Sequence, residues 1–206
     1  MSSILLSGPA VEPVTLAEAK AYLRVEHGDD DDVIAALIAG ARVHVEAQTR
    51  RALITQSWRL IRDAWPDDGL PSPKRSGFGF AQAGRLSVLP VPLRALTAAR
   101  VYRFDGTTQA LDTAAFVADV AAAPAVLSFA AGALPAPGRI VAGIELDVEV
   151  GYGDTPAEVP ENLRQAIRIL VAHWYENRGL IAAGAGVAVL PQTVAALLAP
   201  YRVLSL

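Results

Sequence analysis

Three carboxylates occupy alternate positions of one short segment: Glu145, Asp147 and Glu149. Side chains spaced by two along a strand project from the same face, so these three are expected to lie together. Carboxylate oxygens are ligands of hard divalent cations, and a small metal-dependent enzyme is one function that such a face could support. The favoured interpretation is the solvated face of an amphipathic strand over residues 144–150, because apolar residues fill the positions between the carboxylates.

The acidic run Asp29–Asp32 is a second candidate for cation binding. A calcium loop of the EF-hand type that begins at Asp29 needs a glutamate at its twelfth position, where the chain has Gly40. A loop that begins at Asp30 or Asp31 also lacks the glutamate, since Ala41 or Arg42 then occupies the twelfth position. The run is instead predicted to lie at the positive N-terminal end of a helix.

The remaining chemistry-bearing residues do not form a recognisable site. His27, His44 and His173 are scattered without metal-ligand spacing, and His173 is expected to be a half-buried helix residue rather than an acid or base. There is no cysteine, which excludes thiolate nucleophiles, thiolate metal sites and disulfides. No G-x-S-x-G elbow is present, and the G-x-G matches at residues 77–79, 151–153 and 184–186 are not continued to G-x-G-x-x-G. We therefore predict no catalytic, metal-binding or cofactor-binding residues and a protein that is not an enzyme.

Bulk composition fits a globular protein of one domain, or of one domain with a large insertion. Of 206 residues, 52% are apolar and 19% charged, far from the composition of disordered chains. The formal net charge of −3 and the pI of about 5.6 give no general attraction for nucleic acid or an anionic membrane. No signal peptide or spanning segment is recognisable, so we expect a soluble protein without membrane contacts.

Helical patterns occupy both ends of the chain. Thr15 and Glu18 have capping-box spacing before a short helix, and apolar residues from Ile34 to Val45 form one stripe of a second helix. A third helix, over residues 160–178, carries Leu163, Ile167, Leu170 and Trp174 on one face, and a last short helix covers residues 191–199. A glycine- and alanine-rich segment, residues 180–189, separates the last two as a predicted hinge.

Residues 56–153 have the two-residue period of β-strands. Strands are predicted over residues 58–63, 85–89, 96–104, 107–111, 116–120, 126–129 and 144–150. Asp105–Gly106 indicates a hairpin, and the long loop 66–84 is either mobile or a contact element. The fold class is therefore α+β: a small helical bundle formed by both chain ends, residues 1–55 and 154–206, with an inserted antiparallel β domain.

The C-terminal segment is unusually apolar for a tail that follows a hinge, and residues 180–206 are predicted to be a hinge and docking segment. It can dock on its own domain or on a neighbouring subunit or partner, and the sequence leaves both possibilities open. The residues predicted to bind a partner are Leu190, Val194, Leu197, Leu198, Tyr201, Arg202, Val203, Leu204 and Leu206.

An ordered set of short stretches resembles the head–tail connector, or adaptor, family of long-tailed phages and phage-derived gene transfer agents. The stretches are TLAEAK at residues 15–20, DVIAALI at 32–38, RALITQSW at 51–58, GYGD at 151–154, VPENL at 159–163, HWYENR at 173–178 and LLAPYR at 197–202. Each is weak alone, but they cover most of the chain in the family's order. The loop 66–84 and the hinge 180–189 match nothing in the family.

The resemblance implies a structural subunit of the particle neck, assembled in the bacterial cytoplasm. Such subunits form a ring of twelve below the portal, contact the stopper or tail-terminator protein, and let DNA pass through the lumen without sequence-specific binding. The family's C-terminal segment reaches toward the portal, which favours residues 190–206 as the portal contact. Another neck or tail-completion protein, similar to a stopper, is the alternative within the same class.

Overall fold

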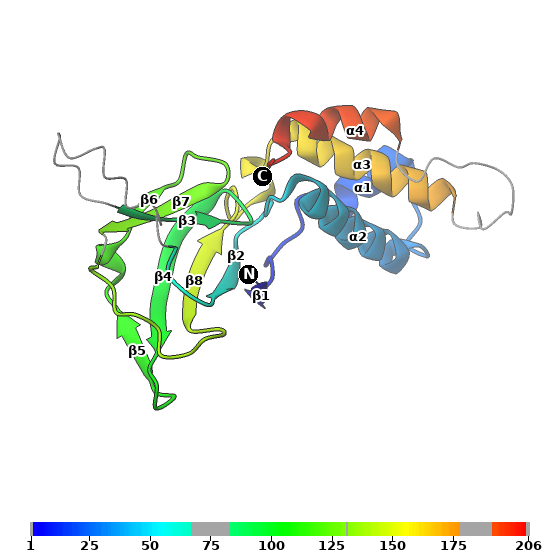
Figure 1. The fold of residues 1–206 in the computed structure, drawn as a ribbon. Helices are drawn as coiled ribbons and strands as arrows, with labels where there is room; N and C mark the ends of the chain where they lie inside the picture. Colours follow the sequence, from blue (N-terminus) through cyan, green and yellow to red (C-terminus); the bar gives the residue numbers. More distant parts are fainter. Residues whose placement is uncertain (1, 67–82, 131, 178–190, 205–206) are drawn as a thin grey trace, which may run out of the picture. The chain divides into compact units, whose positions relative to one another are not determined.

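The computed structural model describes residues 2–66, 83–130, 132–177 and 191–204. Contacts between Cα atoms divide the chain into two compact units (Figure 1). The β unit consists of Met1–Gly8 and Gln56–Gly151, and the helical unit consists of Pro9–Thr55 and Tyr152–Leu206. Four α-helices and two antiparallel sheets confirm the prediction of a mixed α+β protein.

The helical unit is built from segments before and after the β unit in the sequence. Its elements are α1 (Leu16–Leu23), α2 (Asp31–Thr49), the 3₁₀ turn η2 (Pro156–Glu158), α3 (Glu161–Glu176), α4 (Gln192–Leu198) and the 3₁₀ turn η3 (Ala199–Tyr201). Helix α3 contacts α1, α2 and α4. It is therefore the element around which the other helices pack.

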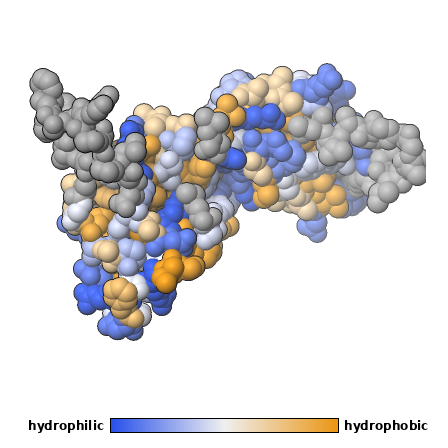
Figure 2. Space-filling model, in the orientation of Figure 1, coloured by the Kyte–Doolittle hydropathy of each residue, from blue (hydrophilic) through white to orange (hydrophobic). Residues whose placement is uncertain are grey.

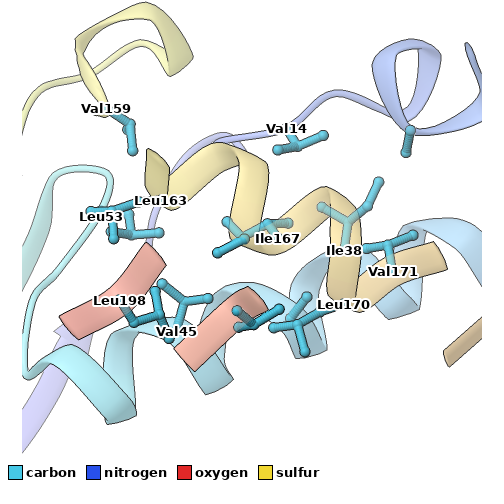
Figure 3. Packing of buried hydrophobic residues seen from close by; sticks show 14 of the residues in the cluster. Val14, Ile38, Val45, Leu53, Val159, Leu163, Ile167, Leu170, Val171 and Leu198 are labelled. Carbon is cyan, nitrogen blue, oxygen red and sulfur yellow. The ribbon is translucent and has the colours of Figure 1, made fainter. Parts of the chain in front are cut away.

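One apolar cluster fills the centre of the helical unit. The predicted stripe of α3 is confirmed, since Leu163, Ile167 and Leu170 are fully buried, and Trp174 packs against the cluster. Figure 3 shows these α3 side chains facing others from α2 and α4, including Val45 and Leu198. Fully burying one such side chain contributes about 1.5–3 kcal/mol, so this cluster is the main source of stability for the unit.

The starts of the first two helices follow the sequence prediction. Thr15 and Glu18 form a complete capping box: the Thr15 hydroxyl accepts from the Glu18 amide at 3.2 Å, and the Glu18 carboxylate accepts from the Thr15 amide at 2.8 Å. Asp31 lies in the first turn of α2, where it accepts a hydrogen bond from Lys20 Nζ at 2.5 Å. The acidic run therefore marks a helix start rather than a calcium loop.

The ends of the same helices carry no sequence signal. Helices α1 and α2 both end on an arginine in the left-handed conformation, Arg24 (φ 59°) and Arg50 (φ 56°). Glycine is the usual residue in this conformation because it lacks a Cβ atom. Both arginine amides donate to helix carbonyls, and these bonds close the two helices.

The described part of the β unit contains eight strands in two antiparallel sheets. The larger sheet has the order β1-β2-β8-β4-β5, and the smaller one has the order β3-β7-β6. The strands are β1 (Ser2–Ser7), β2 (Gln56–Arg62), β3 (Ala83–Val88), β4 (Leu93–Tyr102), β5 (Thr108–Leu111), β6 (Val117–Asp119), β7 (Ala125–Ala130) and β8 (Ile144–Val150). The predicted hairpin forms between β4 and β5, where Gly106 has a φ of +82°.

The first strand departs from the sequence prediction, which places residues 1–55 in the helical part. Residues Ser2–Ser7 pair with β2 in antiparallel orientation and belong to the β unit. Every residue of β1 is exposed, so no alternation of buried and exposed positions marks it as a strand. Its conformation depends on its pairing with β2, whose paired residues lie 50 to 59 positions away in the sequence.

Alternate residues of both sheets form the interior of the β unit. Ile144, Leu146, Val148 and Val150 of β8 are fully buried, as the sequence period predicts. From the smaller sheet, Leu127 is fully buried and Phe129 packs edge-on against Trp65. No helix in the described part of the chain is long and apolar enough to cross a membrane.

Leu198 in α4 and Leu204 beyond it provide a matched test of this packing. Leu198 is fully buried, whereas Leu204 is 85% exposed. We expect Leu198→Ala to lower the free energy of unfolding by about 2–5 kcal/mol, because it leaves a cavity in the helical cluster. Leu204→Ala is expected to change it by less than about 0.5 kcal/mol. Urea denaturation followed by circular dichroism measures both, and equal effects of the two substitutions would contradict the packing of α4.

Candidate functional site

The three carboxylates singled out in the sequence lie on β8, the central strand of the larger sheet. Strand β2 runs along one side of β8 and β4 along the other. The pairing places Arg59 directly opposite Asp147 and Arg100 directly opposite Glu145. Residues that face each other across neighbouring strands project from the same side of the sheet. The carboxylates therefore share their face with arginines from both flanking strands.

A network of ion pairs results, which we call the β8 charge network. Arg59 makes a two-pronged contact with Asp147, with Nε–Oδ1 and Nη2–Oδ2 distances of 2.7 and 3.0 Å. Arg100 donates to the same carboxylate and, at 3.2 Å, to Glu145. The Tyr102 hydroxyl donates to the second oxygen of Glu145 at 3.0 Å. Glu145 and Asp147 side chains are each only 12% exposed.

Titration behaviour follows from these contacts. The hydrogen bonds from Arg59 lower the pKa of the Asp147 carboxyl, and the charge of Arg100 lowers it further, although burial opposes both effects. The same hydrogen bonds raise the pKa of the Arg59 guanidinium. Both groups are therefore held in their charged forms.

This geometry corrects the favoured interpretation of the acidic face. Glu145 and Asp147 are not solvated, because the arginines of the neighbouring strands cover and neutralise them. At the end of the strand, Glu149 is more open and pairs with Arg94 at 3.1 Å. Three arginines thus face three carboxylates, and the face is neither a set of free metal ligands nor an acidic surface.

The arginine partners were not singled out in the sequence. Arg59 and Arg100 each stand at a polar position within a predicted strand, which is the only local signal they give. Their pairing with β8 requires the order and register of three strands, because the contacts to Asp147 join residues 88 and 47 positions apart. No periodicity within one segment contains that information.

The other candidates for chemistry are also accounted for. The ring of His44 packs edge-on against Trp174, with 6.1 Å between ring centroids. His173 lies within α3, and His27 is a solvent-exposed neighbour of Asp29. In residues 2–66, 83–130, 132–177 and 191–204, no three histidine, cysteine, aspartate or glutamate side chains come together to hold a metal ion.

The one G-x-G match within the described ranges, Gly151–Gly153, serves the local fold. The Glu158 carboxylate accepts hydrogen bonds from the amides of Asp154 and Thr155, both at 2.9 Å. An added Cβ atom at Gly153 would lie 2.0 Å from Glu158 Cδ, so glycine makes room for this cap. The other two matches, residues 77–79 and 184–186, lie outside the described residues, as do most of loop 66–84 and the whole of hinge 180–189.

The helical unit also carries a groove of about 470 Å³ lined by Val11, Val14, Leu16, Ala35, Ile38 and Pro156, with Glu12 and Thr15. Thr15 is committed to its capping box, and Glu12 pairs with Arg42 at 2.8 Å. A small-molecule site normally has several convergent polar groups besides its apolar lining. This groove lacks them, so it gives no support to catalysis.

The C-terminal segment divides into buried and exposed residues, which narrows the predicted partner-binding set. Val194 and Leu198 are fully buried in the helical cluster, and Val203 is 5% exposed while its amide donates to the Thr49 carbonyl at 3.1 Å. Because they pack within their own unit, these three cannot form an outer contact surface in this conformation. Leu197 and Tyr201 are half-buried, Arg202 and Leu204 are exposed, and Leu190 and Leu206 lie outside the described residues.

Substitution of Asp147 tests the β8 charge network. We expect Asp147→Asn to lower the free energy of unfolding by about 1–3 kcal/mol at pH 7, because Arg59 and Arg100 lose their charged acceptor. Glu149→Gln is the matched control, and its more open ion pair with Arg94 should contribute about 0–1 kcal/mol. Urea denaturation of the three proteins measures the difference. Equal losses in both variants would argue against a special role of Asp147.

The ion pairs of Asp147 also predict how the stability difference between wild type and Asp147→Asn depends on pH. The folded-state pKa of Asp147 lies below its unfolded value of about 3.9, so its stabilising contribution is present above that pH. The contribution is lost as the pH falls through the folded-state pKa. The stability gap between wild type and Asp147→Asn should therefore shrink as the pH is lowered from 7 to below about 4, and a constant gap would contradict the ion-pair origin.

The chain is similar over its full length to solved components of gene transfer agent (GTA) particles. A chain in the neck of the empty GTA particle, computed with C6 symmetry, is 26% identical, with a TM-score of 0.72 and coverage of 100% of this chain and 97% of that one. A chain in the virion of the native GTA particle is 24% identical, with a TM-score of 0.74 and coverage of 100% and 97%. A chain in the neck of the native particle, computed with C12 symmetry, is 22% identical, with a TM-score of 0.69 and coverage of 98% and 97%.

The last two likenesses show a shared fold, and the first adds a closer sequence similarity. No family model and no curated protein matches the sequence. The chain therefore shares its fold with chains of GTA particles, two of which come from the particle neck.

Proposed function

We propose that this protein is a non-enzymatic adaptor subunit in the neck of a tailed phage or phage-derived gene transfer agent. Copies form a ring, of twelve subunits, that joins the portal of the capsid to the stopper or tail and lets DNA pass through its lumen. The particle neck is assembled in the bacterial cytoplasm. The observation that carries the proposal is the full-length similarity to a chain of the empty GTA neck, at 26% identity.

The architecture supports the proposal. The two compact units are best interpreted as a small helical bundle made by Pro9–Thr55 and Tyr152–Leu206, and an antiparallel β domain made mainly by the segment between them and completed by Met1–Gly8. This is the arrangement that the resemblance to the adaptor family implies.

The chemistry of the side chains points in the same direction. Glu145 and Asp147 are paired with arginines. The alternative of a small metal-dependent enzyme needs these carboxylates as free metal ligands, so the pairing argues against it. DNA that only slides through a lumen needs no specific contacts, and a face whose charges are balanced neither repels nor holds phosphate strongly.

The portal contact is proposed for the exposed part of the C-terminal segment. Leu204 is 85% exposed although it is aliphatic, and Arg202 beside it is also exposed. Both follow η3 and flank Val203, which is the last buried residue of the described segment. A partner that covers Leu204 would remove apolar surface from water, which favours association.

Another neck component, similar to a stopper, remains the second candidate. The similar neck and virion chains fit either role, because what favours an adaptor in particular is the ordered set of sequence stretches. A particle image that shows which ring the chain occupies, directly below the portal or further toward the tail, separates the two roles.

Purified protein mixed with the portal of the same particle tests the adaptor proposal. We expect negative-stain electron microscopy to show rings seated on the portal, and sedimentation to show co-migration of the two proteins. Leu204→Asp should weaken portal association at least tenfold, since it places a charge in an apolar contact. Val43→Asp, on the exposed face of α2 (55% exposed), is the matched control and should bind as wild type does.

A protein that stays monomeric at high concentration and does not associate with the portal would rule the proposal out. Normal binding by Leu204→Asp would contradict only the assignment of the C-terminal contact. Circular dichroism of both variants verifies that neither substitution has unfolded the chain.

A further inference from the structure

Strand β1, at one edge of the larger sheet, is uncharged and exposed along its whole length in the described structure. Strand β1 has the sequence Ser-Ser-Ile-Leu-Leu-Ser, and Ile4, Leu5 and Leu6 are 49%, 47% and 46% exposed. Ile4 and Leu5 point to opposite faces of the strand, so both faces are open. Among the described strands, only β2 pairs with β1, which leaves its other edge free.

Proteins usually protect such an edge, because its unpaired backbone groups can pair with another chain. The usual devices are lysine, proline, a very short strand or a bulge. Strand β1 contains neither lysine nor proline and has six residues. Its only irregularity lies between Leu5 and Ser7, so Ser2–Leu5 remain in regular pairing with β2.

Apolar surface continues beside this strand. Ile140 and Val141, in the loop before β8, are 94% and 71% exposed. The loop is tied to the end of β2 by the Ala142 amide, which donates to Asp63 at 2.8 Å, and Ile61 of β2 is paired with Ser2. Figure 2 shows hydrophobic surface at the lower right of the β unit, where Figure 1 places β1 and the loop that leads into β8.

The opposite edge of the same sheet is also uncharged. It is formed by β5, with the sequence Thr-Gln-Ala-Leu, in which Thr108 and Ala110 are exposed. Four antiparallel pairings separate the two edges, so β1 and β5 run in the same direction. A neighbouring copy could therefore continue the sheet by placing its β5 parallel to β1, without any like charges meeting.

A cyclic ring requires two different surfaces on each subunit that fit each other, whereas a patch that binds its own copy gives only dimers. We infer that β1 of one subunit docks on β5 of the next copy of this chain in the ring. This inference rests on the proposed function, because it assumes a ring of copies around an axis. The similar neck structures were computed with C6 and C12 symmetry. The exposed loop residues Ile140 and Val141 extend the same contact.

Substitution at β1 tests the contact in the full-length protein. Leu5→Lys adds a charge to each subunit at the edge, as protected edge strands do, and should weaken ring formation at least tenfold. Val117→Lys, on β6 of the other sheet (71% exposed), is the matched control and should assemble normally. Light scattering after size-exclusion chromatography gives the oligomeric state, and circular dichroism shows that both variants are folded.

Cross-linking tests the identity of the two edges and does not depend on the folding of Leu5→Lys. The natural chain has no cysteine, so Ser3→Cys and Ala110→Cys introduce the only thiols. Within one subunit the two edges are four strand spacings apart, about 19 Å, which a short bifunctional thiol reagent does not span. The double variant should give a ladder of multimers. Each single variant should stay monomeric, because equal thiols on neighbouring copies are farther apart than the two edges of one subunit.

The outcomes separate the two proposals. Intact rings of folded Leu5→Lys, or a double variant that gives no ladder while its rings form, would overturn the β1–β5 contact and leave the adaptor function standing. Intact Leu5→Lys rings that no longer bind the portal would instead assign β1 to the portal and also overturn the inference. If the wild-type chain forms no ring, alone or with the portal, the adaptor function itself fails, and the inference fails with it.

Discussion

The whole structure depends on one constraint: the chain leaves the helical unit and returns to it at neighbouring points. Ile54 and Gly153 form an isolated bridge, the Thr55 amide donates to the Gly153 carbonyl at 2.9 Å, and the Tyr152 amide donates to Leu53 at 3.3 Å. Because these bonds hold the two crossings together, segments from both ends of the sequence can share one apolar cluster. The same constraint sets β2 beside β8, the strands that begin and end the long excursion.

The charged residues of β8 and its two neighbouring strands hold these strands in register. Asp147 accepts from Arg59 on one flanking strand and from Arg100 on the other, so one carboxylate joins three strands. Burying such charges is costly unless every partner is in place, and a shifted register would leave an unpaired charge at the centre of the sheet. The network therefore favours one register and offers no free group for chemistry.

The C-terminal segment contains both packed and exposed apolar residues. Val194 and Leu198 complete the helical cluster, while Leu204, six residues beyond Leu198, has almost no contact with it. Of the two possibilities that the sequence left open, self-docking therefore holds for Val194 and Leu198, while partner binding stays a proposal for the exposed Leu204. Removing the whole segment would expose the helical cluster, so only single substitutions at its exposed positions can separate binding from stability.

The sequence by itself determined the elements whose pattern is local. The stripe of α3, the capping box of Thr15 and Glu18 and the alternation along β8 follow from the spacing of side chains within one segment, and the resemblance to neck adaptors follows from the order of short stretches. Only the tertiary structure decided that Ser2–Ser7 form an edge strand, that arginines neutralise the carboxylates of β8, and that α4 belongs to the helical cluster. These features depend on partners distant in the sequence, and periodicity within a segment fixes which face a residue occupies but not what lies against it.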